Sequence, residues 1–186
     1  MVLVRQFMWI HLFMIILNIF CSKLVQSQDN TLLQWEFRFT PVRACETGLS
    51  TCNQASLSKG SVLLFDGGIG LTWKFQLTPF NASWSLVKTS NTPPADGRDC
   101  FAMSSVEDGK VLLFGGKNGG KIYADCWIFE QSVNDWVHVN IKTKAPNFPK
   151  ARYNHAMASL GEGKVFLFGG TSEDETDLND CWLFDV

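Results

Sequence analysis

One string of residues occurs three times in this chain, and its repetition limits what the chain can fold into. Residues 163–170 read GKVFLFGG, and residues 109–116 read GKVLLFGG. Residues 60–68 read GSVLLFDGG, in which Asp66 is one additional residue before the glycines. Self-similarity at a fixed period indicates a repeat architecture, in which each copy is one supersecondary unit.

Glycine, tryptophan and arginine residues recur with the same period, which is about 50 residues. The glycines that end the apolar runs are Gly67, Gly68, Gly115, Gly116, Gly169 and Gly170. The tryptophans form two series, which are Trp73, Trp127 and Trp182, and Trp35, Trp84 and Trp136. The arginines are Arg43, Arg98 and Arg152, and each comes shortly after a proline (Pro41, Pro94 and Pro149). Because these series share one period, the sequence contains three copies of one structural unit.

The second copy shows how one unit is expected to be built. Asp108-Gly109 lies between two apolar runs, where a glycine accepts the positive φ of a tight hairpin turn. Asn134-Asp135 marks a second turn before an alternating segment. The predicted strands, A to D, are residues 98–106, 110–116, 125–131 and 136–141. Each unit is therefore predicted to be four antiparallel strands, which with this period is typical of one blade of a β-propeller.

The order of residues in each unit resembles the kelch motif. An apolar run, Gly-Gly, a polar loop, W-x-F, a second Trp, Pro and Arg follow one another, and Arg152, His155 and Ala156 match the usual start of strand A. The resemblance covers residues 31–186 and implies an all-β, kelch-type β-propeller. The predicted blades are residues 43–90, 91–145 and 146–186, the last of them lacking its outer strand.

Three four-stranded blades are expected to be part of an incomplete propeller, because propellers typically have about 4–8 blades. Residues 28–42, which include Trp35, are interpreted as an outer strand that closes the final blade. We therefore expect the chain to be the first portion of a longer protein with further blades. The alternative is a short form that oligomerises to cover its open sheet edges.

Residues 1–27 have the pattern of a secretory signal peptide. One positive charge, Arg5, precedes an apolar run at 7–20, which is short for a membrane-spanning helix. Cleavage is predicted between Ser27 and Gln28, which gives a secreted protein without stable membrane insertion after cleavage. The alternative interpretations of the segment are an uncleaved anchor or a buried strand.

Secretion permits disulfides and glycosylation. Cys45 and Cys52 are close in sequence and are predicted to form a disulfide, whereas the partners of Cys100, Cys126 and Cys181 are left open. Asn81, in the sequon at 81–83, is the predicted glycosylation site, in the turn between strands C and D of the first blade.

The candidate binding residues lie in the B–C and D–A loops, which share one side of the sheets because successive strands alternate in direction. The resemblance implies that partners bind there. The candidates are Arg98, Lys117, Asn118, Lys121 and Arg152, together with the acidic loop at 173–177. The arginines have two interpretations: they contact a ligand or, as we favour, they donate hydrogen bonds to backbone carbonyls of a neighbouring blade.

The sequence has no pattern of a catalytic, metal or cofactor site. It lacks the G-x-S-x-G and Walker spacings, and its histidines have no metal-ligand spacing. The net charge of −2 gives no reason to expect nucleic acid. We expect a non-catalytic, extracellular kelch module that binds a protein or a glycan. The alternatives are the first part of a galactose-oxidase-like propeller enzyme, or an intracellular kelch adaptor with a mispredicted start.

Overall fold

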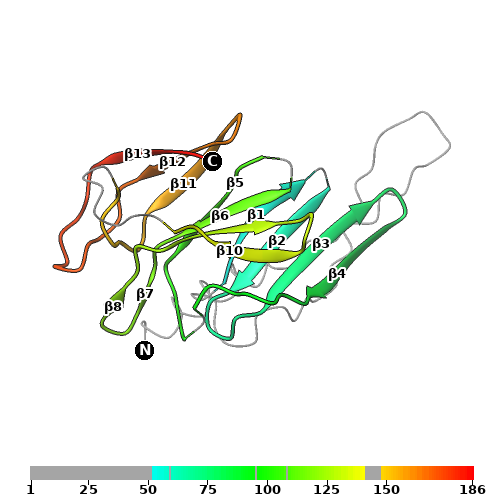
Figure 1. Ribbon diagram of the computed structural model, residues 1–186, viewed down its shortest axis with the longest axis horizontal. Coiled ribbons are helices and arrows are strands. Elements are labelled where there is room, and N and C mark those ends of the chain that lie inside the picture. The colour runs from blue at the N-terminus through cyan, green and yellow to red at the C-terminus, as the bar shows by residue number, and fades with distance from the viewer. Residues whose placement is uncertain (1–51, 59, 95, 108, 141–147) are drawn as a thin grey trace, which may run out of the picture.

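The computed structural model describes residues 52–186 except 59, 95, 108 and 141–147. The described residues form only β-strands and connecting loops, with no helix that could cross a membrane. Three antiparallel sheets follow one another along the chain (Figure 1). The sheet drawn in green and yellow lies between the cyan sheet and the orange and red sheet. This is the arrangement of successive propeller blades, so the all-β prediction is confirmed.

The three sheets have the same strand order, and each follows the sequence. Blade 1 contains β1 (Cys52–Ser58), β2 (Ser61–Asp66), β3 (Thr72–Thr78) and β4 (Asn81–Val87). Blade 2 contains β5 (Ala102–Ser105), β6 (Lys110–Phe114), β9 (Cys126–Glu130) and β10 (Asp135–His138). Blade 3 contains β11 (Ala156–Gly161), β12 (Lys164–Phe168) and β13 (Cys181–Asp185). A small hairpin, β7 (Lys117–Asn118) and β8 (Lys121–Ile122), extends from blade 2 between β6 and β9.

The turn between strands A and B is tight in the third blade because three successive residues, Gly161, Glu162 and Gly163, adopt positive φ. Glu162 has φ +52° and Gly163 has φ +74°, which is the backbone pattern of a type I′ hairpin turn. A side chain at Gly163 would also bring its Cβ to 2.9 Å from the carbonyl oxygen of Val186. The repeated glycine at the start of strand B is therefore required by both the turn and the neighbouring strand.

The core lies between the sheets, where strand B of blade 2 is covered on both faces. One cluster joins blades 1 and 2 and contains Leu63 and Phe65 packed with Val111 and Leu113. Alternate residues of β6 point the other way, and Leu112 and Phe114 pack with Val165 and Leu167 of blade 3. Because side chains alternate along a strand, a continuous apolar run is buried when sheets cover both of its faces.

The double glycine ends strand B where segments of three loops approach one another. A Cβ at Gly115 would lie 2.6 Å from the carbonyl oxygen of Arg152, and a Cβ at Gly116 would lie 2.7 Å from that of Asp99. Both glycines also have positive φ, +66° and +98°. Any side chain here would displace the loops that form one side of the molecule.

Candidate interaction face

The loops that join strand B to C and strand D to A meet on one side of the sheets, which we call the loop face. The D–A segment at 88–101 forms an antiparallel bridge with the B–C segment of blade 2 through Asp99 and Lys117. The D–A segment at 148–155 forms the equivalent bridge with blade 3 through Tyr153 and Thr171. These backbone bonds hold neighbouring loops in a fixed arrangement.

Arg98 is the centre of the loop contacts of blade 2, and its side chain is fully buried. Its Nη1 and Nη2 donate to Oδ1 and Oδ2 of Asp125, each at 2.7 Å. Nη1 also donates to the carbonyl oxygen of Gly115 at 3.1 Å, and Nε donates to that of Pro94 at 3.2 Å. A bidentate pair of this kind fixes both distance and orientation. Arg98 therefore ties the D–A loop to the end of strand B and the start of strand C.

Arg152 repeats this arrangement in blade 3. It donates to Oδ1 and Oδ2 of Asp180 at 2.6 and 2.8 Å, and to the carbonyl oxygen of Gly169 at 2.9 Å. The sequence analysis favoured bonds to carbonyls of a neighbouring blade. The acceptor glycine instead lies in the arginine's own blade, and an aspartate is the additional partner. The sequence could have indicated this aspartate, because Asp-Cys-Trp is repeated at the start of strand C in both units.

The tryptophan of strand C completes the contact in the same two blades. The Nε1 of Trp127 donates to Asp125 at 2.8 Å, and that of Trp182 donates to Asp180 at 2.6 Å. The hydrogen bond from Arg152 is the main reason that the pKa of Asp180 falls to about 2, and the bond from Trp182 lowers it further. Asp180 therefore stays ionised at neutral pH and keeps both donors.

Blade 1 departs from this pattern. Leu71 stands where the other blades have aspartate, and the buried Nε1 of Trp73 has no hydrogen-bond partner among the described residues. The additional Asp66 is fully buried at the end of β2 and accepts a bond from the backbone N–H of Gly68 at 2.8 Å. The insertion therefore makes β2 one residue longer than β6 and β12 and changes the B–C loop that follows it.

Tyr123 supports the hairpin that β7 and β8 form. Its ring contacts two cations: the Cζ of Arg98 is 3.8 Å from the ring centroid, and the Nζ of Lys121 is 4.5 Å from it. Its hydroxyl lies 2.7 Å from both carboxylate oxygens of Asp96, and Asn118 donates to the backbone carbonyl of the same Asp96. Burial, followed by the bond to Asp96, raises the pKa of Tyr123 to about 12. The tyrosine therefore remains a neutral donor that anchors this hairpin.

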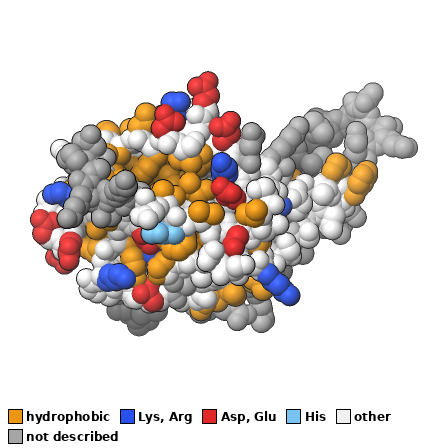
Figure 2. Space-filling view, in the orientation of Figure 1, with side chains coloured by type: hydrophobic (Ala, Val, Ile, Leu, Met, Phe, Trp, Pro, Cys, Tyr) orange, Lys and Arg blue, Asp and Glu red, His pale blue; other side chains and the backbone are white. Residues whose placement is uncertain are grey.

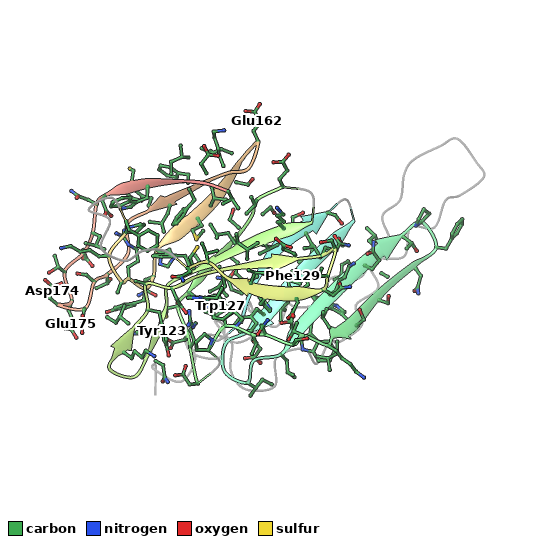
Figure 3. All side chains as sticks on the ribbon, viewed as in Figure 1. Tyr123, Trp127, Phe129, Glu162, Asp174 and Glu175 are labelled. Carbon is green, nitrogen blue, oxygen red and sulfur yellow. The ribbon has the colours of Figure 1, made fainter. Side chains whose placement is uncertain are left out.

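The two lysines of the hairpin sit above aromatic rings. The Nζ of Lys117 is 4.1 Å from the ring centroid of Tyr153, which belongs to the next D–A segment. Lys121 is exposed, and its Nζ lies 4.5 Å from the ring centroid of Tyr123, which Figure 3 labels. Cation–π contacts at this distance orient an ammonium group while leaving it open to solvent. The hairpin thus presents two held positive charges on the loop face.

The B–C loop of blade 3 carries the opposite charge. Asp174 and Glu175 lie at the tip of this loop (Figure 3), and acidic side chains colour the same end of the molecule in Figure 2. The exposed acids are Glu173, Asp174, Glu175 and Asp177. The hydroxyl of Ser172 donates to Asp174, and this bond is the main cause of the lowered pKa of Asp174.

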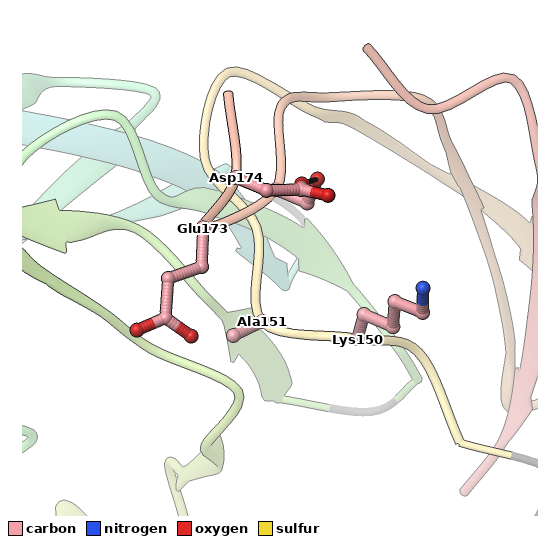
Figure 4. Close-up of a pocket in the computed structure, with 5 residues that line it drawn as sticks. Lys150, Ala151, Glu173 and Asp174 are labelled. Carbon is pink, nitrogen blue, oxygen red and sulfur yellow. Dashed lines mark hydrogen bonds between the residues drawn. The ribbon is translucent and has the colours of Figure 1, made fainter. Parts of the chain in front are cut away.

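A pocket of about 500 Å³ opens beside this acidic loop. Its lining residues are Lys150, Ala151, Ser172, Glu173 and Asp174. Figure 4 shows Lys150 and Asp174 extending toward one side, whereas Glu173 points the other way. The pocket is therefore an open, charged hollow between a D–A segment and a B–C loop.

Comparison with known proteins identifies this arrangement of blades. The family model described as the KLHDC2/KLHL20/DRC7 Kelch-repeats domain matches residues 56–186. The chain belongs to the kelch-repeat family. Kelch repeats mediate protein–protein interaction in general.

The relatives of this kelch chain are diverse. It is 30% identical over 105 residues to the flagellar outer-arm dynein alpha chain of Chlamydomonas reinhardtii, covering 56% of this chain and 2% of the dynein. It is 24% identical over 139 residues to an F-box/kelch-repeat protein of Arabidopsis thaliana, covering 67% of this chain and 29% of that protein. The structure of YjhT has a TM-score of 0.49 at 19% identity, over 70% of this chain and 37% of that one. The chain thus spans less than a third of these two sequence relatives.

The other predicted sites fall in different places. Asn81 is exposed at the start of β4, in the turn region where the glycan was predicted, and its glycosylation stays a prediction. Trp35, Cys45 and the cleavage site after Ser27 lie outside the described residues, so the closing strand, the disulfide to Cys52 and the signal peptide also stay predictions. Within the described residues the cysteines that are free are Cys100, Cys126 and Cys181.

The kelch histidines occupy unlike environments. His155 is buried, its ring nitrogens have no hydrogen-bond partner among the described residues, and its ring lies 5.5 Å from that of Phe114. Burial, followed by the positive charge of Arg152, lowers its pKa to about 4. His138 is exposed at the end of β10 and contacts the ring of Trp127. In the part of the chain that the structure describes, no group of three His, Cys, Asp or Glu residues could hold a metal ion.

Proposed function

We propose that this kelch chain is an extracellular, non-catalytic interaction module that binds a protein partner through its loop face. The observation that carries the proposal is the pair of opposite charges fixed on adjacent blades. Lys117 and Lys121 are held above tyrosine rings on blade 2, and the acidic loop at 173–177 projects from blade 3. A partner protein with acidic groups opposite these lysines and basic groups opposite the acidic loop would bind in one orientation.

The internal contacts of the loop face support binding over catalysis. Arg98, Arg152 and Tyr123 already have carboxylate partners within the chain. They form a rigid support beneath half-buried Lys117, exposed Lys121 and the exposed acids, and do not project toward a substrate. A preformed surface of this kind binds without first having to order its own loops.

The extracellular part of the proposal is supported by the apolar run at 7–20 and the small residues before Gln28. The protein part rests on the kelch family, whose repeats generally mediate protein–protein interaction. The chemistry of the loop face favours a protein over a neutral glycan, because Lys121 and the acids of the 173–177 loop are exposed charges.

Charge reversal on the loop face tests the proposal. The full chain would be screened against an array of extracellular proteins and, in parallel, against a glycan array. We expect a protein ligand whose affinity falls about tenfold or more in the double variant Lys117→Glu, Lys121→Glu, because steering charges set the orientation of binding. Asp174→Lys with Glu175→Lys should weaken the same ligand.

Two matched controls reverse charge on the opposite side of the sheets. Lys110→Glu and Glu162→Lys lie at the A–B turns, and both side chains are exposed. These controls should leave the affinity unchanged. A protein ligand that tolerates both loop-face reversals, or ligands found only on the glycan array, would contradict the proposal.

A further inference from the structure

The outer strand of blade 1 is an exposed sheet edge. Among the described residues, β4 pairs with β3 on one side and with no strand on the other. Its hairpin with β3 lies at one end of the molecule (Figure 1). An edge strand presents unpaired N–H and C=O groups, so a strand of another chain can pair with it. Proteins that stay soluble protect such edges.

The usual protective features are missing from β4. Its sequence, NASWSLV, contains no charged residue and no proline, and its register with β3 has no bulge. The outer strand of blade 2 differs, because β10 has only four residues and begins with Asp135. Short length and charge both discourage strand pairing. β4 has seven residues, so it lacks both of these features.

The turn that leads into β4 adds an exposed aromatic ring. Phe80 is 89% exposed, which is the largest exposure among the large hydrophobic side chains that the structure describes. Leu77, in the same hairpin, is 44% exposed. Apolar side chains beside an unpaired edge make association between chains more favourable.

The first residue of β4 carries the group that a protecting modification would use. Asn81 begins a glycosylation sequon that ends at Ser83, and its side chain is exposed. The hydroxyl of Thr78 accepts from the backbone N–H of Asn81 and donates to its carbonyl oxygen, each at 3.0 Å, which fixes the turn. The Oδ1 of Asn81 accepts from the N–H of Ala82 at 2.9 Å. Its Nδ2, the atom to which an N-linked glycan attaches, has no hydrogen-bond partner among the described residues.

We propose that an N-linked glycan on Asn81 protects the edge of β4 and covers Phe80, and so prevents copies of this chain from associating through that strand. A bulky, solvated group at the first residue of the strand excludes a second strand from the edge. The turn between strands C and D lies on the side of the sheets opposite the loop face, so the glycan leaves the loop face open. The inference rests on the extracellular part of the proposed function and not on partner binding.

The modification is a group transfer from a lipid-linked oligosaccharide, which is the glycosyl donor of the secretory pathway. The Nδ2 of Asn81 forms a bond to the anomeric carbon of the first sugar. The bond from that carbon to the diphosphate oxygen breaks, and the lipid diphosphate leaves with the electron pair. One proton is released from Nδ2, so the product is a neutral amide.

The full chain expressed in eukaryotic cells and secreted by them tests the proposal. Mass spectrometry before and after enzymatic deglycosylation should find an N-linked glycan on Asn81. Ser83→Ala removes the sequon and keeps the asparagine, and light scattering should then show more aggregate than for the glycosylated chain at the same concentration. Adding Ser85→Lys to this variant should reverse the loss of solubility, because it places a charge at an exposed position of β4.

A displaced glycan is the matched control. Asp174→Asn creates a sequon with Thr176 at an exposed position of the acidic loop of blade 3. Combined with Ser83→Ala, it gives a chain with one glycan away from β4, whose occupancy mass spectrometry would verify. This chain should aggregate as the Ser83→Ala chain does, and circular dichroism should show unchanged β-structure for all variants.

Three results would overturn the proposal. The edge role fails if the Ser83→Ala chain aggregates no more than the glycosylated chain, or if the displaced glycan restores solubility. A secreted chain with Asn81 unmodified would overturn this proposal and leave the proposed function standing. A chain retained in the cytosol would overturn both this proposal and the extracellular part of the proposed function.

Discussion

Replacing Asp125 with alanine tests whether buried Arg98 depends on its carboxylate partner. The guanidinium has no exposed surface and is bound by both carboxylate oxygens at 2.7 Å. Removing one partner of a buried ion pair costs about 3–5 kcal/mol, because the remaining charge stays buried without compensation. Asp125 is itself 19% exposed, so water partly replaces the carboxylate, and we expect a loss of about 3 kcal/mol.

The same change at Asp180 should cost less. This side chain is 37% exposed, so water can reach the site when the carboxylate is removed, and we expect a loss of about 1–2 kcal/mol. Asp185→Ala serves as the control, because its carboxylate is exposed on β13 and its removal should change stability by no more than about 0.5 kcal/mol. The free energy of unfolding of each variant would be measured with urea, by tryptophan fluorescence and circular dichroism.

A second pair of variants separates the buried charge from lost packing. Asp125→Leu alone leaves Arg98 charged and unpaired, whereas the double variant with Arg98→Met removes both charges. Replacing a whole buried pair with apolar residues is often neutral or stabilising, so the double variant should unfold at higher urea than the single variant. The reasoning is refuted if Asp125→Ala costs no more than Asp185→Ala, or if the double variant is the least stable.

Three further predictions concern other parts of the chain. Burial lowers the pKa of His155 from 6.5 to about 4, so the contribution of neutral His155 to stability is fully present above pH 6.5. It is lost as the pH drops toward 4, which lowers the free energy of unfolding by up to about 3 kcal/mol. Urea unfolding across this pH range should show a shallower decline of that free energy in His155→Gln. Secreted material should begin at Gln28 on N-terminal sequencing, and cytosolic protein with Met1 intact would contradict the signal peptide. Cys45 and Cys52 should resist alkylation until reduced, and loss of their disulfide should cost about 2–3 kcal/mol.

The strands could be predicted from the sequence because each signal is local. The continuous apolar runs, the turn glycines and the strand C tryptophans lie in the positions that the repeat required. The predicted ends of the strands were less accurate. Strand A of blade 2 was expected from residue 98 but begins at Ala102, because Arg98 binds Asp125 and Cys100 adopts φ +53°. Residues with these constraints cannot continue a regular strand.

The candidate site was less predictable because it depends on contacts between distant residues. Arg98 and Asp125 are 27 residues apart, and only the fold shows that one guanidinium binds both that carboxylate and Gly115. The polar loop after β6 was expected, but its hairpin and the position of Lys121 over Tyr123 were not. The aspartate two residues before the strand C tryptophan recurs in blades 2 and 3, and this repeat could have indicated the partner of the arginine. In blade 1 Leu71 stands at that position, so the repeat is incomplete.

The repeated and the unrepeated residues of the loop face have different roles. Arginine, aspartate and tryptophan recur in blades 2 and 3 and bind one another, so they hold the loops but cannot distinguish one blade from the next. The hairpin with Lys117 and Lys121 and the acidic loop at 173–177 occur once each. Partner selection by the proposed interaction face must therefore come from these unrepeated loops. Exchanging the two loops between blades should alter which ligand binds, because the Arg–Asp pairs beneath each loop stay in place.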